Sequence, residues 1–226
     1  MEVDERGIDT PIKTLVIACN VLKDQIEAIG AMNYDYTYLE QGLHRTPAML
    51  RKELEREIFK ANTYDYILLG YGLCSRAVIG LTAGKNQTLI IPKIDDCIGL
   101  SLGFRSRYYT EFAQNPGTYY FTKGWVEAAD DPLKEYYKTL EKYDEETAEW
   151  TATESLKHYR RTVLIRTQEN EDSAKKYVLE FARFFKLQYE EIAGSLDYIR
   201  KLLLGPWDED FVQIQNGLSI EDHLFS

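Results

Sequence analysis

Short apolar runs alternate with charged, amphipathic stretches along the first half of the chain. The runs at residues 12–18 (IKTLVIA), 65–71 (DYILLGY) and 88–92 (TLIIP) are almost continuously apolar, which is typical of parallel strands buried on both faces. The aromatic and β-branched run at 34–40 predicts a further strand.

Each of these runs is followed by a stretch with helical character. The predicted helices cover about 21–32, 47–61 and 97–113, and a short one begins at Arg76. Regular alternation of strands and helices favours an α/β fold with a Rossmann-like parallel sheet flanked by helices.

The second half continues as another β/α run. An acidic helical region reaches to about residue 159, two further helices lie near 172–186 and 195–204, and strands are predicted at 118–122, 162–166, 187–191 and 211–215. The pattern leaves open whether these strands extend the first sheet or form a second lobe. We expect one α/β domain over residues 1–226, with two lobes, 1–125 and 126–226, as the alternative.

Charge and composition narrow the classes of partner. The 226 residues carry 27 Lys and Arg against 37 Asp and Glu, a formal net charge of -10. Such a surface repels phosphate backbones and anionic lipid, so we expect no nucleic-acid partner and no membrane association. The start of the chain, MEVDERGIDT, lacks a basic and an apolar leader segment, and we expect a cytoplasmic protein.

Four side chains of the kinds that bind metals follow predicted strands. Cys19, His44, Cys74 and Cys97 come after the first, second, third and fourth strands, and these are all three cysteines of the chain. Because the carboxyl ends of parallel strands meet at one edge of a sheet, we expect these side chains to converge, as metal ligands do. The alternative is that the thiols only fill space, since no Cys-x-x-Cys spacing is present.

Three thiolates fit two kinds of centre. One is an iron–sulfur cluster with one iron left available for a substrate, and the other is zinc. His44 would be the fourth ligand or would support the ligands from outside. Asp95 and Asp96 precede Cys97 and are candidate catalytic carboxylates, and they could equally cap the following helix.

The segment LLGYGLCSR offers a different chemistry. Gly70 and Gly72 after a buried strand would let the backbone approach a ligand, and Arg76 could pair with a phosphate or carboxylate. The third glycine of a dinucleotide fingerprint is missing. This pattern supports the alternative of a metal-free enzyme or sensor that binds a small anion.

Two further segments point to the same sheet edge. Arg105 and Tyr108 lie three residues apart on the helix after Cys97, so that one face could hold both for a substrate. Arg105 is a candidate catalytic residue and Tyr108 a candidate binding residue. The segment PGTYYFTKGW at 116–125 would bring a loop from the fifth strand toward this edge.

Together, VIACN, GLHRTP, LLGYGLCSR, IPKIDDCIGLSLG and PGTYYFTKGW make the chain resemble an uncharacterised family, domain of unknown function 1638, of methanogens and other anaerobes. The resemblance covers roughly residues 12–206. It implies that the family's pattern includes Cys19, His44, Cys74, Asp96 and Cys97.

The resemblance also implies a metabolic setting. Members look associated with one-carbon and methylamine metabolism, where corrinoid proteins and methyltransferases act. The corrinoid-ligating pattern Asp-x-His-x-x-Gly is absent from this chain. We therefore expect a metal- or iron–sulfur-binding protein in anaerobic methyl-transfer metabolism, with a small-molecule substrate and a corrinoid or methyltransferase protein as partner. A third hypothesis is an interaction protein that docks on a basic partner through the acidic segment 127–154.

Overall fold

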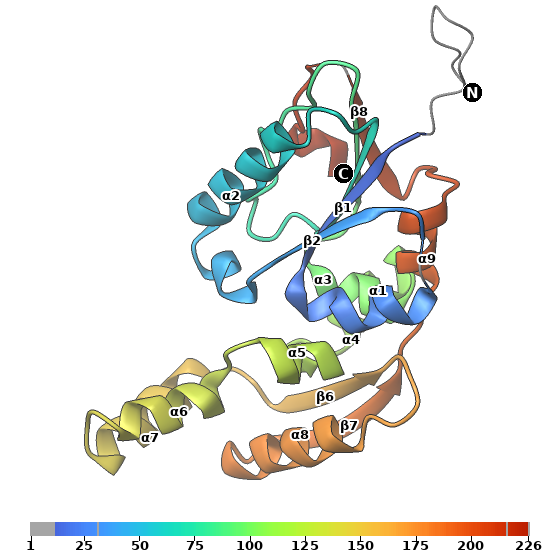
Figure 1. The fold of residues 1–226 in the computed structure, drawn as a ribbon. Coiled ribbons are helices and arrows are strands. Elements are labelled where there is room, and N and C mark those ends of the chain that lie inside the picture. Colours follow the sequence, from blue (N-terminus) through green and yellow to red (C-terminus); the bar gives the residue numbers. More distant parts are fainter. Residues whose placement is uncertain (1–11, 31, 216, 226) are drawn as a thin grey trace, which may run out of the picture.

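The chain folds into two β-sheets surrounded by helices (Figure 1). The computed structural model describes residues 12–30, 32–215 and 217–225, and the acidic N-terminal stretch 1–10 lies outside the described residues. The architecture is mixed α/β, and the larger sheet is mostly parallel and Rossmann-like, as the sequence predicts.

The first sheet has five strands in the order β2-β1-β3-β4-β8. Its strands are β1 (Thr14–Cys19), β2 (Asp35–Leu39), β3 (Tyr66–Gly70), β4 (Thr88–Pro92) and β8 (Phe211–Gln215). The first four run parallel, and β8 pairs antiparallel with β4, placing Ile214 opposite Leu89. The four strands predicted in the first half of the chain are thus confirmed to within two residues at each end.

The second sheet has three parallel strands in the order β5-β6-β7. These strands are β5 (Thr118–Phe121), β6 (Arg161–Arg166) and β7 (Gln188–Ala193). The strands of the second half therefore show both arrangements that the sequence left open, a separate sheet and an extension of the first sheet. Three of them form a sheet of their own, and the last one returns to the first sheet.

Helices cover both sheets. The α-helices are α1 (Lys23–Ile29), α2 (Pro47–Lys60), α3 (Cys97–Leu102), α4 (Arg105–Gln114), α5 (Lys123–Ala128), α6 (Pro132–Leu140), α7 (Glu145–Ser155), α8 (Asp172–Phe184) and α9 (Asp197–Leu204). Short 3-10 helices are η1 (Asn20–Leu22), η2 (Gln41–Arg45) and η3 (Asp222–Phe225). Helix α2 lies on one face of the first sheet and α1, α3 and α9 lie on the other, while α8 packs on β6 and β7 (Figure 1).

Two helix predictions are wrong for a shared reason, a left-handed backbone. The stretch 97–113 contains two helices because Gly103, with a φ of 92°, ends α3. No helix starts at Arg76, because Cys74, Ser75 and Arg76 have φ values of 45°, 56° and 68°. The right-handed helix region is incompatible with these values.

The acidic region resolves into three helices with their own capping residues. Asp131 accepts hydrogen bonds from the backbone of Leu133 and Lys134 at the start of α6, and Asp144 accepts one from Thr147 at the start of α7. Helices α6 and α7 pair with each other beyond the end of the second sheet (Figure 1).

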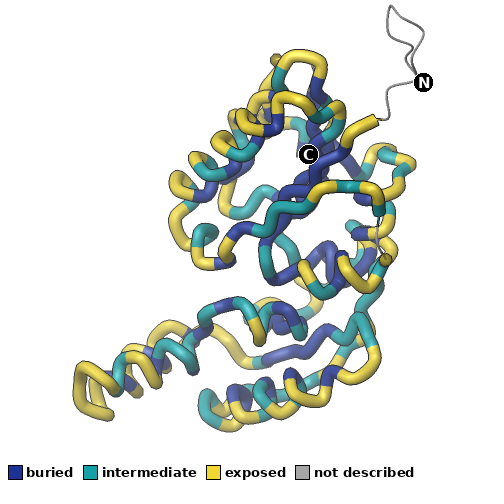
Figure 2. Tube along the Cα trace, viewed as in Figure 1, coloured by how far each residue is buried: buried dark blue, intermediate teal, exposed yellow. Residues whose placement is uncertain are grey.

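Burial follows the two sheets. The strands β1, β3 and β4 and the middle of β6 are buried, whereas α6 and α7 are largely exposed or half-buried (Figure 2). One hydrophobic cluster surrounds the first sheet, and two smaller ones lie on the faces of the second. Within the described residues, no helix has both the length and the apolar character needed to cross a membrane.

Candidate functional site

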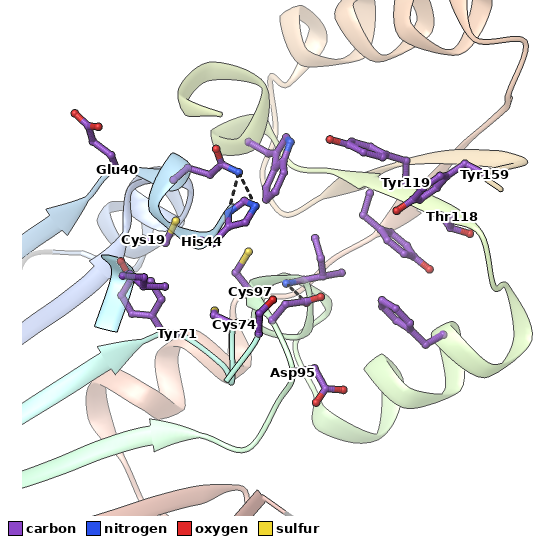
Figure 3. A pocket seen from close by; sticks show the side chains of 18 residues that line it. Cys19, Glu40, His44, Tyr71, Cys74, Asp95, Cys97, Thr118, Tyr119 and Tyr159 are labelled. Carbon is purple, nitrogen blue, oxygen red and sulfur yellow. Dashed lines mark hydrogen bonds between the residues drawn. The ribbon is translucent and has the colours of Figure 1, made fainter. Parts of the chain in front are cut away.

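A cavity of about 530 Å³ lies where the carboxyl edge of the first sheet faces the second sheet. Its volume falls in the range typical of small-molecule sites. One part of its wall carries the three cysteines and His44, and the other part is aromatic and comes from α4, β5 and α5 (Figure 3). The predicted convergence at this edge therefore occurs in the structure.

Each of these four side chains is placed by the end of a different strand. Cys19 is the last residue of β1, and Cys97 is the first residue of α3 after β4. Cys74 lies in the turn after β3, and His44 lies in η2 after β2. Because β2, β1, β3 and β4 are neighbours in a parallel sheet, their ends deliver the four side chains to one cavity.

The turns after β3 and β4 are joined by backbone hydrogen bonds. The amide of Leu73 donates to the carbonyl of Ile94, and the amide of Cys74 donates to that of Asp95, both at 2.8 Å. Gly72 permits this contact, because a Cβ there would lie 2.5 Å from the Ile94 oxygen. Gly72 therefore allows the protein's own backbone, in the turn after β4, to approach closely.

The turn that carries Cys74 is strained. Three consecutive non-glycine residues, Cys74, Ser75 and Arg76, adopt the left-handed conformation, which costs about 1 to 2 kcal/mol per residue. Two of them, Cys74 and Ser75, line the cavity. Strain held at a cavity wall is characteristic of functional sites.

The thiols lie among protein atoms that disfavour their charged form. Burial raises the pKa of Cys19 to about 11 and that of Cys74 to about 12. Burial also raises the pKa of Cys97, and charge on Cys19 or Asp96 raises it further. All three cysteines are free of disulfides and, without a bound cation, carry their protons at neutral pH.

Tyr71 is a member of the same cluster that the sequence pattern did not single out. Its side chain is 3% exposed and lines the cavity, and its hydroxyl has no hydrogen-bond partner among the described residues. Burial raises its pKa, and charges on Cys19, Cys74 and Cys97 would raise it further. An unpaired hydroxyl amid three thiols is available to a bound group.

His44 is held from behind by a buried amide. Gln41, which is 3% exposed, lies with its Nε2 atom 3.0 Å from the Nδ1 atom of His44. The imidazole also lies beside the Trp125 ring, with centroids 5.8 Å apart. Burial, helped by Arg45, lowers the pKa of His44, so the neutral ring is favoured.

The two aspartates have different environments. Asp96 caps α3 by accepting from the backbone of Ile98 at 2.9 Å, and its carboxylate also accepts from the hydroxyl of Tyr108. Burial nevertheless raises the pKa of Asp96 to about 6. Asp95 is exposed, and both carboxylates line the cavity. The capping role considered for this pair is confirmed for Asp96.

Other residues selected from the sequence lie outside the cavity lining. Arg76 is exposed and forms a salt bridge of 2.7 Å with Asp222. Arg105 donates to the carbonyl of Phe225 at 3.2 Å, and Tyr108 is buried behind Asp96. The lining also excludes Gly70, whose added Cβ would meet the Cβ of Ala18 on the neighbouring strand at 2.6 Å.

The donor atoms are not arranged around a single point. Within residues 12–30, 32–215 and 217–225, no three His, Cys, Asp or Glu side chains are placed to hold one metal ion. Figure 3 shows the thiols of Cys19, Cys74 and Cys97 distributed around one end of the cavity, with the ring of His44 beside them.

The sequence predicts only some residues of the aromatic part of the wall. The segment 116–125 was expected at this edge, and its Thr118, Tyr119, Tyr120 and Trp125 line the cavity. Tyr159, in the loop between α7 and β6, also lines the cavity and has no local sequence signal. A tyrosine-rich composition alone gives no signal for such a position.

Comparison with known proteins gives a family and no activity. No curated protein and no solved structure matches the chain. A family model does match, over residues 38–203, a range that includes His44, Cys74 and Cys97 and leaves out Cys19. Since the match covers well over half of the chain, the protein belongs to the family described as protein of unknown function DUF1638.

Proposed function

We propose that Cys19, Cys74 and Cys97 hold an iron–sulfur cluster at the carboxyl edge of the first sheet. The observation that carries the proposal is that three thiols from three neighbouring strand ends line one cavity. Buried cysteines that only fill space have no reason to meet at an opening. Thiolates are the usual protein ligands of such clusters.

The spacing of the donors favours a cluster over a single zinc ion. The ligand atoms of one tetrahedral ion must all lie about 2.0 to 2.3 Å from it. The described side chains do not offer three donors in such an arrangement. The thiolates of a cluster bind different irons and lie farther apart than the ligands of one ion. Binding a cluster would therefore require less movement of the strand ends. Zinc is the alternative, and it would require these ends to close.

The residues around the thiols suit such a group. His44 is favoured in its neutral form and can act as a fourth ligand or donate to one. The unpaired hydroxyl of Tyr71 can donate to a thiolate sulfur, which would satisfy a buried polar group that otherwise lacks a partner. The carboxylate of Asp96 next to Cys97 can take or give a proton in the cavity.

The thiols open onto the cavity instead of closing around a point, and this favours a reactive centre over a structural one. When bound, a cluster with one iron free of protein ligands would supply Lewis-acid or electron-transfer chemistry to a small molecule. The protein's own part would be to exclude water, to orient that molecule against the aromatic wall, and to place Asp96 beside it.

The setting we propose is anaerobic one-carbon metabolism, with a corrinoid or methyltransferase protein as partner. Its support is the sequence resemblance alone. The cavity is compatible with two roles there, an enzyme acting on a small substrate or a module that delivers a cofactor to the partner. A cavity with room beside the thiols favours the first role.

The proposal is tested on protein purified without oxygen. Iron, zinc and acid-labile sulfide are measured together with the ultraviolet–visible spectrum, for the wild type and for Cys19→Ser, Cys74→Ser and Cys97→Ser. We expect iron and sulfide with a visible absorption band in the wild type, and loss of both in each variant. Ser75→Ala is the matched control, because Ser75 lines the same cavity and supplies no thiol.

Two outcomes would contradict the proposal. Fresh wild-type protein without bound metal, even after incubation with ferrous iron and sulfide, would favour a metal-free small-molecule protein. Zinc without sulfide, lost in the same three variants, would replace the cluster by a thiolate zinc site. Circular dichroism of each variant shows whether loss of metal reflects loss of fold.

A further inference from the structure

The part of the cavity wall opposite the thiols is built of aromatic rings. Tyr119 and Tyr159 meet edge to face with ring centroids 5.6 Å apart, and Phe112 stacks on Tyr120 at 5.8 Å. Phe112 and Tyr159 are 42% and 36% exposed, and both rings line the cavity. Aromatic surface is therefore presented to whatever enters the cavity (Figure 3).

The negative charges of the wall come from three carboxylates. Glu40, Asp95 and Asp96 line the cavity, and its lining contains no Lys or Arg. The carboxylates of Glu40 and Asp95 form no ion pair with any residue in the described part of the chain. They lie at separate margins of the cavity (Figure 3). The opening is thus negative, in a protein whose net charge is already -10.

Two arginines near the cavity pair with carboxylates outside its lining. Arg45, next to His44 in sequence, donates to Glu135 at 3.0 Å and to the carbonyl of Asp130 at 3.1 Å. Arg161, in the neighbouring strand β6, pairs with Glu111 and with Glu190. Arg45 and Arg161 are thus paired with carboxylates, and among the described residues the cavity lining includes no Lys or Arg.

We infer that the aromatic wall of this cavity binds a small organic cation, a protonated or quaternary amine. The exposed rings of the lining, Tyr159 and Phe112, attract a cation that is too bulky for a tight ion pair. The unpaired carboxylates at the margins raise its local concentration. A metal cation would instead need carboxylates grouped around one point, which the described residues do not provide.

This inference goes beyond the proposed cluster and does not rest on it. Tyr119 and Tyr159 lie away from the thiols, so this part of the cavity can be occupied independently of the thiol end. If both assignments hold, the cation would lie beside the metal-binding end, and the amine would be the substrate. The binding experiment leaves all three cysteines unchanged and can be done with chelator-treated protein.

The test compares a cation with an uncharged molecule of the same shape. Choline and its neutral carbon isostere 3,3-dimethylbutan-1-ol are titrated into the protein by calorimetry, with acetate as the anionic probe. We expect choline to bind at least about tenfold more tightly than the isostere, and acetate not to bind. Sodium chloride at matched ionic strength controls for screening.

Paired variants locate the binding. Tyr159→Leu removes one ring of the wall, and Tyr143→Leu removes a ring that is 62% exposed and outside the cavity lining. Asp95→Asn removes a marginal charge, and Glu209→Gln removes an exposed charge elsewhere. We expect about tenfold weaker choline binding in Tyr159→Leu, a smaller loss in Asp95→Asn, and no change in the two controls.

Equal affinity for choline and its isostere would overturn the inference, and so would equal losses in Tyr159→Leu and Tyr143→Leu. Tighter binding of acetate would replace the cation by an anion. Because the titration uses protein without metal, cation binding in a protein that never takes up iron would contradict the cluster alone. Iron uptake without choline binding would contradict this inference alone.

Discussion

The amide of Cys74 donates a hydrogen bond of 2.8 Å to the carbonyl of Asp95, two residues before Cys97. This bond and its neighbour, from Leu73 to Ile94, fasten the turn after β3 to the turn after β4. Two of the three thiols are therefore positioned by the same pair of backbone contacts. Any change that separates these turns should move both thiols together.

Gly72→Ala is the most direct way to separate the turns. The added Cβ would lie 2.5 Å from the Ile94 oxygen and 2.8 Å from the Asp96 nitrogen, both backbone atoms that cannot rotate away. We expect a loss of about 1 to 3 kcal/mol in the free energy of unfolding, measured with urea, and reduced iron content. Gly42→Ala, which meets nothing within 4 Å, should leave both unchanged.

Ser75→Gly should stabilise the protein. Ser75 has a φ of 56° between two other left-handed residues, and glycine adopts this conformation without steric cost. We expect the free energy of unfolding to rise by about 1 kcal/mol in thermal or urea denaturation. Ser106→Gly, in the right-handed helix α4, should lower it. A loss of stability in both variants would show that the turn is unstrained.

Tyr71→Phe should have opposite effects on the two states of the site. In metal-free protein the variant removes a buried hydroxyl that has no partner, and the free energy of unfolding should rise by about 1 kcal/mol. After reconstitution with iron and sulfide, we expect the wild type to become at least as stable as Tyr71→Phe, because the hydroxyl then donates to a sulfur. Thermal unfolding with and without reconstitution measures both.

Tyr108→Phe is the matched control for this hydroxyl. The hydroxyl of Tyr108 donates to the carboxylate of Asp96, so its removal should destabilise metal-free protein by about 1 kcal/mol. Destabilisation of metal-free protein by Tyr71→Phe as well would mean that the hydroxyl of Tyr71 has a partner within the protein.

The pH dependence of stability should change in Asp131→Asn. Asp131 is fully buried, and burial raises its pKa above the usual 3.8, although Tyr177 donates to its carboxylate. Between 3.8 and the raised pKa the folded state holds more protons than the unfolded state. The wild type should therefore lose stability relative to Asp131→Asn as pH rises through this window.

Urea denaturation from about pH 4 to pH 7 measures this difference. Asp208→Asn is the control of opposite sign, because Lys201 holds the pKa of the exposed Asp208 below its usual value. The wild type should lose stability relative to that variant as pH falls. Parallel pH profiles for wild type and Asp131→Asn would contradict the raised pKa.

The strands could be predicted because their signal is local. Strands β4 and β8 match the predicted residues 88–92 and 211–215 at both ends, since each is an apolar or alternating run bounded by polar residues. Their pairing could not be predicted, because an antiparallel contact between residues so distant in sequence depends on the whole fold. The same applies to the separation of β5, β6 and β7 into a second sheet.

The candidate site also has a part that the sequence predicts and a part that depends on the whole fold. The meeting of the cysteines followed from one general rule about strand ends, and the cavity contains all three. Tyr71 was missed because it lies between two glycines that drew attention to the backbone, and its unpaired hydroxyl is a property of packing. The left-handed turn at Cys74 was missed because three consecutive non-glycine residues rarely adopt it.

The position of β8 has a consequence for synthesis on the ribosome. Strand β4 is complete at residue 92, but among the described residues its outer edge pairs with residues 211–215, which are made much later. Until residues 211–215 leave the ribosome, the nascent chain exposes a row of unpaired amides and carbonyls, which attracts other strands. Chains truncated before residue 211 should therefore aggregate, and binding of chaperones should be strongest before residues 211–215 emerge.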